Sequence, residues 1–413
     1  MLRKLIRRSV SKSTIHSLHS FSGFNFNHIV RDSTYDYIIA GAGCAGLSLA
    51  VQIAGSPSLR NKKILLIDKA SKNANDRTWC YWEKDPGFFD DILFRKWNRV
   101  WFHGDGIASL LDISPYSYKM IRGIDFYNYC FQILKDHPGF NMLYEEIKAV
   151  SNEGGMTFVK TEHNLYKAEF VFNSVPFQQP EKKAGTYHLL QHFKGWIVET
   201  PGPVFNTREA TLMDFRTPQH QGTTFLYTMP FSSTQALVEY TLFSESVLTD
   251  EEYDTGLRTY LSERLGISQY SILETEKGII PMTNHRFREK EGRIFHIGTA
   301  GGQTKPSTGY TFRNIQMQVS EIIKSLEKSG RPDAGIKKTA SRFHWYDSIL
   351  LNILSNRKLE GKYIFSELFK KNNPTKILRF LDNATTMREE FSLLRSLPQW
   401  PFLKAGIEEL VKK

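Results

Sequence analysis

The sequence has few cysteines and no long apolar run. Its three cysteines, Cys44, Cys80 and Cys130, are widely separated in a chain of 413 residues. Such a set fits neither a disulfide framework nor a zinc cluster, so we expect a reducing compartment and no metal site. No run of about 18 apolar residues occurs, and a membrane-spanning helix is therefore not expected.

Acidic residues are absent from the start of the chain. Six basic residues precede the first acid, Asp32: Arg3, Lys4, Arg7, Arg8, Lys12 and Arg31. Residues 1–33 are typical of a basic surface anchor or an organelle-targeting segment, and equally of a disordered extension; targeting is the less favoured interpretation. The net charge of +11 fits a solvated surface or attraction to anionic lipid headgroups. Nucleic acid is not expected as a partner, because no basic stripe with interleaved aromatics is present.

A glycine motif follows the extension. Gly41, Gly43 and Gly46 have the spacing G-x-G-x-x-G between an apolar run and a helical pattern. These glycines would allow a tight turn, approach of a pyrophosphate, and close packing of helix on strand. A second buried-strand pattern, residues 64–67, ends in Asp68, about 20 residues further on, where an acid binds ribose hydroxyls. The pattern predicts a dinucleotide site, and the alternative is a plain glycine turn in an α/β unit.

A second glycine-rich turn lies late in the chain. Gly298, Gly301, Gly302 and Gly309 follow a short strand pattern, and an amphipathic helix runs from there to about residue 327. Glycines allow the backbone to approach a ligand closely, and the N-terminal amides of the helix favour an anion or an electron-rich ring. We expect this turn to form the second wall of the cofactor site.

The remaining pattern predicts an α/β fold in which a Rossmann-like nucleotide-binding domain carries an inserted antiparallel sheet and a helical C-terminal region. A buried strand at residues 169–174 returns to the nucleotide sheet, and a helix is expected from about 124 to 136. The inserted sheet is expected to wall a substrate cavity; its strands are residues 189–199, 210–215, 223–229 and 236–243. The expected boundaries are 1–33 for the extension, 34–174 and 286–330 for the nucleotide-binding domain, 175–285 for the sheet, and 331–413 for the helices. The aromatic positions of those last helices fit core packing or a basic-aromatic face in a membrane interface.

Two carboxylates of the inserted sheet are candidates for acid chemistry. Strand alternation places Glu239 on one face with Leu237, Thr241 and Phe243. An apolar environment would raise the pKa of Glu239 and keep a proton available, as a general acid requires. Alternation alone favours the other interpretation, an exposed glutamate on the solvent side of the sheet. Asp214 is a similar case, with a salt bridge to Arg216 as the simpler explanation.

The chain resembles one family, the flavin-dependent lycopene cyclases of carotenoid-making bacteria and plants, over about residues 35–405. The runs most specific for that family are Gly-Trp-Ile-Val-Glu-Thr at 195–200 and Ala-Gly-Gly-Gln-Thr-Lys-Pro-Ser-Thr-Gly-Tyr at 300–310. Further matches are residues 36–50, 75–83, 172–174, 191–200, 213–216, 226–230, 237–241, 278–282 and 298–312. In one departure, many members have an acidic residue where this chain has Tyr240, so a second carboxylate beside Glu239 is missing.

The resemblance implies a function. Glu239 would be the catalytic acid/base in a ring closure without net redox change. A proton adds to C2 of a lycopene end, the C5=C6 bond attacks the C1 cation, and loss of the C6 proton gives a β-ionone ring, leading to γ-carotene and β-carotene. The implied cofactor is reduced FAD, kept reduced by NAD(P)H. The implied substrates are lycopene and other acyclic or monocyclic carotenes, which are dissolved in membrane, so we expect a cytoplasmic, peripheral membrane protein.

For several residues the resemblance leaves more than one role open. Arg77 meets a phosphate or the flavin edge, or else pairs with Asp76. The aromatic candidates for stabilising the cation are Trp79, Tyr81, Trp82 and Trp196. A redox flavoenzyme of the same fold, such as a monooxygenase or a prenyl reductase, is the main rival. Thr299 counts against a hydroxylase, because hydroxylases of this fold usually have an aspartate there. A second rival is a flavin-binding or carotenoid-carrying protein without catalysis.

Overall fold

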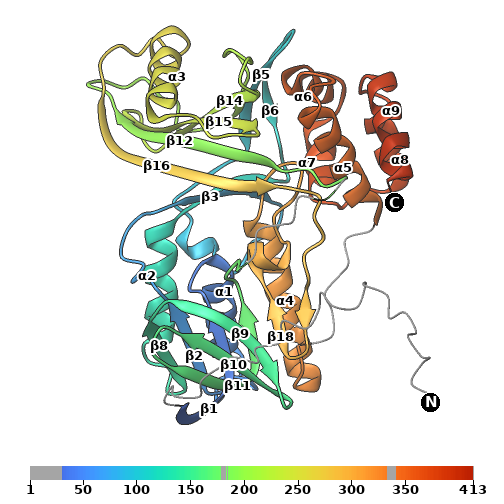
Figure 1. Ribbon diagram of the computed structural model, residues 1–413. Helices are drawn as coiled ribbons and strands as arrows, with labels where there is room; N and C mark the ends of the chain where they lie inside the picture. Colours follow the sequence, from blue (N-terminus) through green and yellow to red (C-terminus); the bar gives the residue numbers. More distant parts are fainter. Residues whose placement is uncertain (1–29, 178–182, 184, 333–340, 413) are drawn as a thin grey trace, which may run out of the picture.

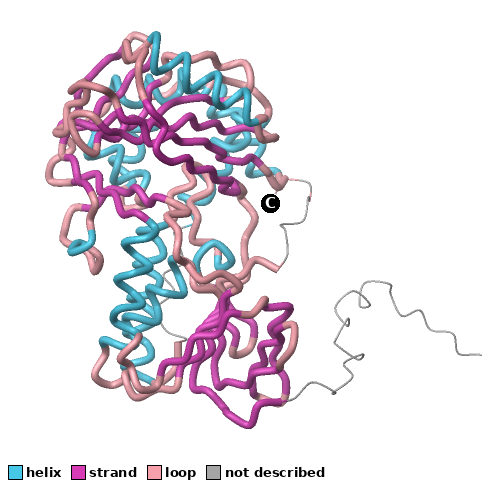
Figure 2. Tube along the Cα trace, turned by 90° about the vertical axis from the view of Figure 1, so that its left-hand side faces the viewer, coloured by secondary structure: helices cyan, strands magenta, loops and turns pink. Residues whose placement is uncertain are grey.

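Two sheets lie at opposite ends of the long axis of the molecule. The computed structural model describes residues 30–177, 183, 185–332 and 341–412 (Figure 1). Figure 2 shows the two sheets separated by a layer of loops and flanked by helices. The predicted basic extension lies outside the described residues up to position 29. Among the residues that are described, no helix is long and apolar enough to cross a membrane.

The first sheet is built around the glycine motif. Strand β1 (Val30–Ala40) is parallel to β2 (Ile64–Asp68) on one side and to β11 (Leu165–Asn173) on the other. The strand order is β17-β18-β11-β1-β2-β8, with a hairpin of β9 and β10 on the edge of β11. The bounds of these strands are β8 Phe140–Tyr144, β9 Ile147–Glu153, β10 Met156–Thr161, β17 Lys290–Glu291 and β18 Ile294–His296. The predicted return of residues 169–174 to this sheet is confirmed.

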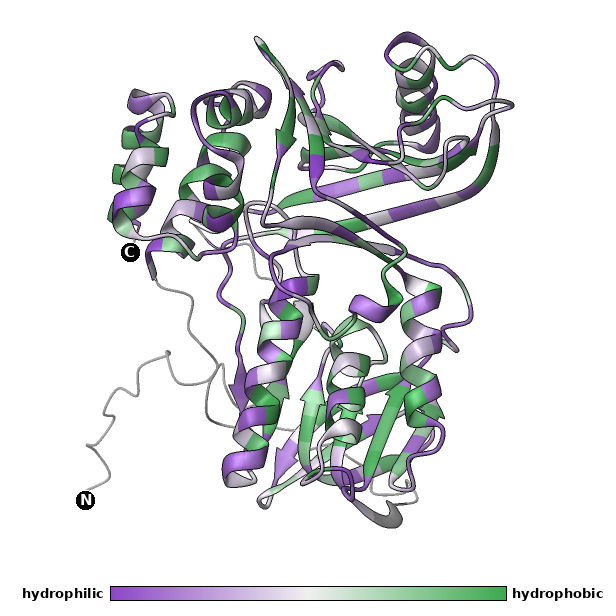
Figure 3. Cartoon of the chain, turned by 180° about the vertical axis from the view of Figure 1, so that it is seen from behind, coloured by the Kyte–Doolittle hydropathy of each residue, from purple (hydrophilic) through white to green (hydrophobic). Residues whose placement is uncertain are grey.

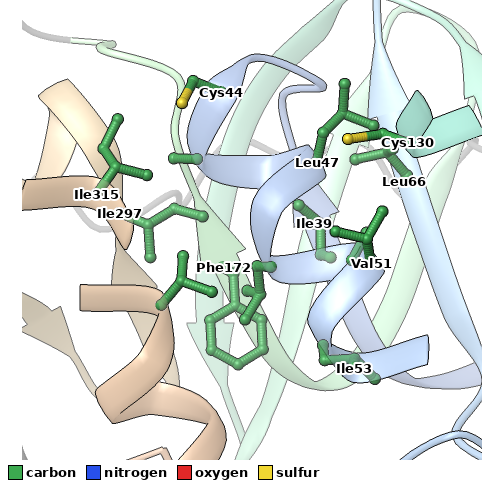
Figure 4. Packing of buried hydrophobic residues seen from close by; sticks show 14 of the residues in the cluster. Ile39, Cys44, Leu47, Val51, Ile53, Leu66, Cys130, Phe172, Ile297 and Ile315 are labelled. Atoms are coloured by element: carbon green, nitrogen blue, oxygen red, sulfur yellow. The ribbon is translucent and has the colours of Figure 1, made fainter. Parts of the chain in front are cut away.

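Three helices cover one face of the first sheet: α1 (Cys44–Gly55), α2 (Gly123–Leu134) and α4 (Phe312–Ser329). The helices predicted near residues 124 and 327 are confirmed. Figure 4 shows Leu47 and Val51 of α1 packed towards Ile39 and Leu66 of the strands, with Ile315 of α4 on the other side of α1. Figure 3 shows that strands of this sheet are the most apolar part of that end of the molecule. Burial of this apolar surface holds the two glycine turns against each other.

The second sheet is mainly antiparallel and confirms the four predicted strands. Its order is β16-β12-β15-β14-β13-β5-β6. The bounds are β12 Leu189–Glu199, β13 Glu209–Asp214, β14 Thr223–Pro230, β15 Gln235–Ser244 and β16 Ser271–Met282. Helix α3 (Asp250–Glu263) covers its outer face. Sequence patterns gave no element for α3 or β16, because β16 is an edge strand in which charged and apolar side chains are mostly exposed.

Two strands from within residues 34–174 belong to this second sheet. Strand β5 (Arg99–Gly104) pairs in parallel with β13, and β6 (Ile107–Asp112) continues the edge. A small sheet of β3 (Thr78–Glu83), β7 (Ser117–Arg122) and β4 (Arg95–Trp97) lies between the two large sheets (Figure 1). The burial of Val100 and Phe102 explains why β5 joins the antiparallel core.

The C-terminal region is helical, as predicted. Its helices are α5 Ser341–Ser355, α6 Gly361–Lys371, α7 Pro374–Leu381, α8 Met387–Leu394 and α9 Gln399–Val411. Helix α6 packs on the second sheet, with Phe369 stacked on Phe102 at 4.3 Å and Phe365 on Phe215 at 5.8 Å between ring centroids. Core packing therefore accounts for Phe365 and Phe369 of α6. Helices α8 and α9 lie at the outer edge of the group (Figure 1).

Candidate functional site

A cavity of about 550 Å³ lies between the two large sheets. The end of the cavity near the first sheet is lined by residues of the two glycine turns, including Gly43, Cys44, Gly298 and Gly309. Its other end is lined by strands β12, β14, β15 and β16 of the second sheet, and part of its side by β3. The structure thus brings the two predicted glycine turns and the inserted sheet to one site.

The first glycine turn has the geometry of an anion site. Gly41 has φ +101°, and Gly46 packs so closely that an added Cβ would lie 1.9 Å from the carbonyl oxygen of Gly41. At Gly43, by contrast, a Cβ would meet no atom within 4 Å. No side chain caps the N-terminus of α1, and its first turn holds no acid. The first-turn amides of α1 are therefore available to a negatively charged ligand group.

The second glycine turn rests directly on the first. Gly298 has φ +61°, and an added Cβ there would lie 2.8 Å from the Cβ of Ala45 in α1. Gly309 has φ +71°, and its Cβ would lie 2.2 Å from Oε1 of Gln191 on β12. Gly301 and Gly302 end a short 3-10 helix and do not line the cavity. Of the four glycines, Gly298 and Gly309 line the cavity, and approach of their backbone to a ligand stays a prediction.

Buried polar atoms in this part of the cavity lack partners. The amide oxygen of Gln191 and the hydroxyl of Thr308 are both buried, and neither has a hydrogen-bond partner within the described chain. Both residues line the cavity. Because an unpaired buried polar group costs about 1–3 kcal/mol, these atoms fit a site in which a polar ligand satisfies them.

Of Asp68 and Arg77, only Arg77 lines the cavity. Asp68 does not line the cavity: its carboxylate accepts hydrogen bonds from the amides of Ala42, at 2.7 Å, and Ala70, at 2.8 Å. Asp68 therefore holds the glycine turn in shape from the end of β2. Arg77 does line the cavity and also pairs with Asp76 at 3.1 Å. The predicted ion pair is therefore present, and contact of Arg77 with a phosphate or a flavin stays a prediction.

Glu239 faces the cavity from β15. Its side chain is buried, and Leu237 of the same face lines the cavity with it, so the solvent-exposed alternative is wrong. The hydroxyl of Thr241 donates a hydrogen bond of 2.8 Å to Oε1 of Glu239. Burial, reinforced by the negative charge of Glu276, raises the pKa of Glu239 well above its ordinary value. Glu239 can therefore hold a proton at neutral pH.

Glu276 is a site residue that sequence reasoning missed. It lies on β16, lines the cavity, and accepts a hydrogen bond of 2.7 Å from the hydroxyl of Thr78 on β3. Burial raises its pKa as well. Residue counting could have found it, because Glu276 stands two positions before Gly278, the start of a quoted motif, and therefore on the same face of a strand. The sequence analysis predicted no strand at β16, so strand alternation was not applied to Glu276.

Asp214 is not brought to the cavity. Its carboxylate is fully buried and binds the guanidinium of Arg216, with a shortest distance of 2.6 Å, and the hydroxyl of Tyr260 at 2.9 Å. Burial acts to raise the pKa of Asp214, but its hydrogen bonds to Arg216 hold the pKa below the ordinary value. Strand β14 separates Asp214 from the strand of Glu239. The simpler explanation, an ion pair, describes this residue.

The cavity has a different aromatic lining from the one expected. Of the four candidates only Trp79 lines it; Tyr81 and Trp82 lie beside Phe312 and Tyr310, and Trp196 faces the α3 side of the sheet. The aromatic lining consists of Trp79, Tyr118, Phe193, Tyr227, Tyr310 and Phe312.

Position 240 faces away from the cavity. The ring of Tyr240 packs under α3, where a Cβ on Gly256 would lie 2.6 Å from it. An acid at this position would lie on the far face of the sheet from Glu239. The departure at Tyr240 therefore removes no carboxylate from the cavity.

The run at 300–310 is anchored to the C-terminal helices. Lys305 is buried and binds Asp347 of α5 at 2.9 Å and the side-chain oxygen of Asn383 at 2.8 Å. The hydroxyl of Ser307 donates to the same aspartate at 2.6 Å. These contacts tie the second glycine turn to the helical region.

Comparison with known proteins places the chain in a family. A family model described as lycopene cyclase protein matches residues 36–406. A lycopene beta-cyclase of a Paracoccus species is 23% identical over 416 residues, covering 90% of this chain and 99% of that protein. A chromoplastic capsanthin/capsorubin synthase of Citrus sinensis is 26% identical over 302 residues, covering 67% of this chain. The match spans only 57% of that plant protein.

Solved structures confirm the predicted fold class. A flavoprotein/dehydrogenase of Cytophaga hutchinsonii superposes with a TM-score of 0.61 at 13% identity, covering 92% of this chain and 100% of the other. A geranylgeranyl bacteriochlorophyll reductase-like protein of Thermoplasma acidophilum gives 0.55 at 12% identity, covering 92% and 99%. These likenesses describe the fold, whereas the family model matches the sequence itself. The chain belongs to the lycopene cyclase family.

Proposed function

We propose that the protein cyclises the ends of lycopene and related acyclic or monocyclic carotenes to β-ionone rings by proton addition. The observation that carries the proposal is Glu239, a buried carboxyl with a raised pKa that faces a cavity between two glycine turns and the inserted sheet. Family membership supports the choice of substrate. The product is a cyclic isomer of the substrate, so the reaction needs no net oxidant or reductant.

The proposed step begins at Glu239. Its O–H bond breaks as a C–H bond forms at C2 of the terminal C1=C2 double bond, which leaves a cation at C1. The C5=C6 bond attacks C1 and closes the ring, and loss of the C6 proton forms the ring double bond and returns a proton to the site. The aromatic residues Trp79, Tyr227 and Phe193 line the same space, and their π electrons can stabilise the cation.

The fit of the site to a flavin dinucleotide supports FAD as cofactor. The uncapped N-terminus of α1 with the open space at Gly43 suits the pyrophosphate, and Asp68 shapes that turn. The unpaired atoms of Gln191 and Thr308 and the backbone of Gly298 and Gly309 suit a polar ring system. Reduced FAD, maintained by NAD(P)H, would supply an electron-rich ring beside the developing cation.

A membrane-contacting face on α8 and α9 would give access to the substrate. These helices expose Met387, Phe391, Trp400, Leu403, Ile407, Leu410 and Val411, with Trp400 exposed to 77%. Arg388 and Lys404 are exposed on the same two helices, and the exposed Arg395 and Lys412 directly follow them. Apolar side chains among cations fit an anionic bilayer surface. We therefore place the protein at a membrane surface as a peripheral, cytoplasmic protein.

A liposome experiment tests that face. The double variant Trp400→Glu/Ile407→Glu should lose sedimentation with vesicles of anionic phospholipid while keeping its melting temperature. Exchange of an exposed apolar residue outside the helices, Val204→Glu, is the matched control. Unchanged sedimentation of the double variant would place membrane contact elsewhere on the molecule.

Expression in lycopene-accumulating cells tests the function itself. We expect cyclic carotenes to replace lycopene, as separated by chromatography. Persistence of lycopene in the presence of folded, flavin-loaded protein would contradict the proposal. Oxygenated or saturated products, with NAD(P)H consumed in proportion, would instead support the redox rival, and carotenoid binding without any product would support a carrier.

A further inference from the structure

Three adjacent strands place two glutamates on either side of one glycine. Strand β12 lies between β15 and β16, and Gly195 of β12 is the register partner of Glu239 on one side and of Glu276 on the other. Figure 1 shows β12 and β16 running side by side. Cross-strand partners project from the same face of a sheet, so both glutamates point to the face that lines the cavity.

Gly195 leaves the space between the two carboxyls empty. An added Cβ there would lie 3.3 Å from Cγ of Glu276, 3.5 Å from Cβ of Glu239 and 2.9 Å from a methyl carbon of Leu237. The strands that carry the glutamates are two strand spacings apart, about 10 Å, which two glutamate side chains can bridge only across an unobstructed position. The negative charge of Glu276 acts on Glu239 and raises its pKa, which requires the two carboxyls to lie close to each other.

Each carboxyl is held from outside the pair by a threonine. Thr241 donates to Glu239 at 2.8 Å, and Thr78 donates to Glu276 at 2.7 Å. No lysine or arginine of the described chain forms an ion pair with either carboxyl. The lysines nearest along the strands, Lys194 and Lys277, are bound by Asp250 of α3. With no cation to neutralise it, the pair is expected to retain one proton between two oxygens.

Other ionisable groups lie around the pair. They are Asp76, Arg77, Cys80, Tyr118, Tyr227, Glu274, Lys277 and Tyr310. Burial raises the pKa of the Cys80 thiol and of the three phenols, which therefore stay protonated. Asp76 and Arg77 stay ionised as a pair, because their hydrogen bond lowers the pKa of the acid and raises that of the base against the effect of burial. No histidine lines the described cavity.

From this geometry we propose that Glu239 and Glu276 form a carboxyl pair that shares one proton across Gly195, with Glu239 as donor to the substrate and Glu276 as its positioning residue. This inference rests on the proposed cyclisation and adds a residue to it. The proton leaves Glu239 for C2, and both carboxylates are then charged beside the cation. The C6 proton returns to Glu239, so the pair ends with the single proton with which it began. C2 and C6 are both bonded to C1, so one donor position can reach both.

The test is the pH profile of ring formation by the full, flavin-loaded protein. Glu276→Gln keeps the side-chain size but removes the charge that favours a protonated Glu239. We expect activity at low pH to stay within about threefold of the wild type. The pH at which activity falls on the alkaline side should be lower by about one unit or more. At a pH above this fall, the activity of the variant should therefore be about tenfold below that of the wild type. Equal loss at every pH with an unmoved alkaline fall would mean a merely structural role and would overturn the inference.

Two further variants sharpen the test. Glu274→Gln removes a charge two residues away on the same strand. The alkaline fall in its activity should shift less than that of Glu276→Gln, because Glu274 bonds Asn75 at 3.2 Å and acts on the pair only through its charge. Gly195→Ala adds a methyl group between the carboxyls and should shift the alkaline fall in the same direction as Glu276→Gln. A shift in the control as large as in Glu276→Gln would contradict the pair.

Infrared titration separates this inference from the proposed function, because it needs no substrate. The wild type should show the carbonyl band of a buried protonated carboxyl that persists to alkaline pH. Glu239→Gln should abolish this band or move its titration, and Glu276→Gln should lower its titration midpoint. Absence of the band at neutral pH would overturn the shared proton even in an active cyclase. Its presence in a protein that forms no rings would leave the pair supported and the proposed function refuted.

Discussion

The two ends of the cavity are built in different ways. The end at the first sheet consists mainly of backbone: Gly43, Gly298 and Gly309 expose peptide groups, and their positions follow from short local motifs. The opposite end consists of side chains from strands far apart in sequence, and Glu239 and Glu276 meet only because of sheet register. A backbone wall suits binding of a large, common cofactor, whereas a side-chain wall can set the chemistry of one substrate. Substitutions at the backbone end should therefore lower cofactor binding, whereas substitutions at the side-chain end should lower the rate of the reaction.

The largest effect is expected at the side-chain end. Glu239→Gln should lower the rate of ring formation by about 100-fold or more, in the range that loss of a general acid gives, because glutamine has no carboxyl proton to donate. Bound flavin should remain at the wild-type level, since this residue lies at the far end from the glycine turns. The measurement is product formation per bound flavin. Normal turnover by this variant would show that another group supplies the proton.

The next effect concerns the anchor of the second glycine turn. Lys305→Met removes the cation that pairs with the carboxylate of Asp347 in a buried site, which should lower the free energy of unfolding by about 3–5 kcal/mol. Chemical denaturation measures this loss, and bound flavin should fall with it. The double variant Lys305→Met/Asp347→Leu is the control and should recover most of the stability. A single variant as stable as the wild type would show that the turn does not depend on this ion pair.

A smaller effect is expected from a methyl group at the backbone end. Gly298→Ala combines a left-handed backbone with close contact to Ala45, and the backbone alone should cost about 1–2 kcal/mol. Flavin content should fall, while turnover per bound flavin should change little. The matched control is Gly55→Ala at the end of α1, where a Cβ meets nothing within 4 Å and φ is not positive. Full flavin loading of Gly298→Ala would show that the second glycine turn does not take part in flavin binding.

The side-chain end should also have a measurable pH-dependent cost in stability. Because the pKa of Glu239 is raised above its ordinary value of 4.5, the folded state holds this proton more tightly than the unfolded state. The stabilisation is complete below about pH 4.5 and is lost as pH rises towards the folded-state pKa, by up to about 1.4 kcal/mol per pH unit. Glu239→Gln should therefore gain stability relative to the wild type between about pH 5 and pH 8. A constant difference across that range would contradict a raised pKa.

The smallest effect is expected at position 240. Tyr240→Phe removes a hydroxyl on the α3 side of the sheet, opposite the cavity. Turnover should stay within about twofold of the wild type, and the pH profile should keep its shape. A clear shift of the profile would mean that position 240 influences the carboxyl pair through the sheet.

Sequence predicted the backbone end better than the side-chain end, for a physical reason. Gly41 to Gly46 and Gly298 to Gly309 are contiguous motifs, and the strands before them, β1 and β18, contain short apolar runs, residues 37–40 and 294–295, that indicate burial. Glu239 was found through alternation and a family resemblance, but alternation alone favoured the wrong face. The deciding fact is which side of the sheet meets the first domain, and no local pattern contains it.

Glu276 and Asp214 show the same limit of sequence-based prediction. Glu276 lines the cavity but was missed, whereas Asp214 was a candidate but lies away from the cavity. Glu276 lies on an edge strand with charged neighbours, so its sequence is typical of an exposed loop, and only pairing of β16 with β12 brings it to Glu239. Asp214 belongs to a family-like run and suggested catalysis, yet its partners Arg216 and Tyr260 occupy its oxygens away from the cavity. Contacts between distant strands decide both cases.

The most direct test of proton-initiated ring closure is turnover in deuterated water. Flavin-loaded, reduced protein would act on lycopene in liposomes, and the product would be analysed by mass spectrometry. If a protonated carboxyl starts the reaction, each ring formed should carry one solvent deuteron at C2, and NAD(P)H should not be consumed in proportion to product. Rings without deuterium, or a product whose oxidation level differs from that of lycopene, would contradict the account.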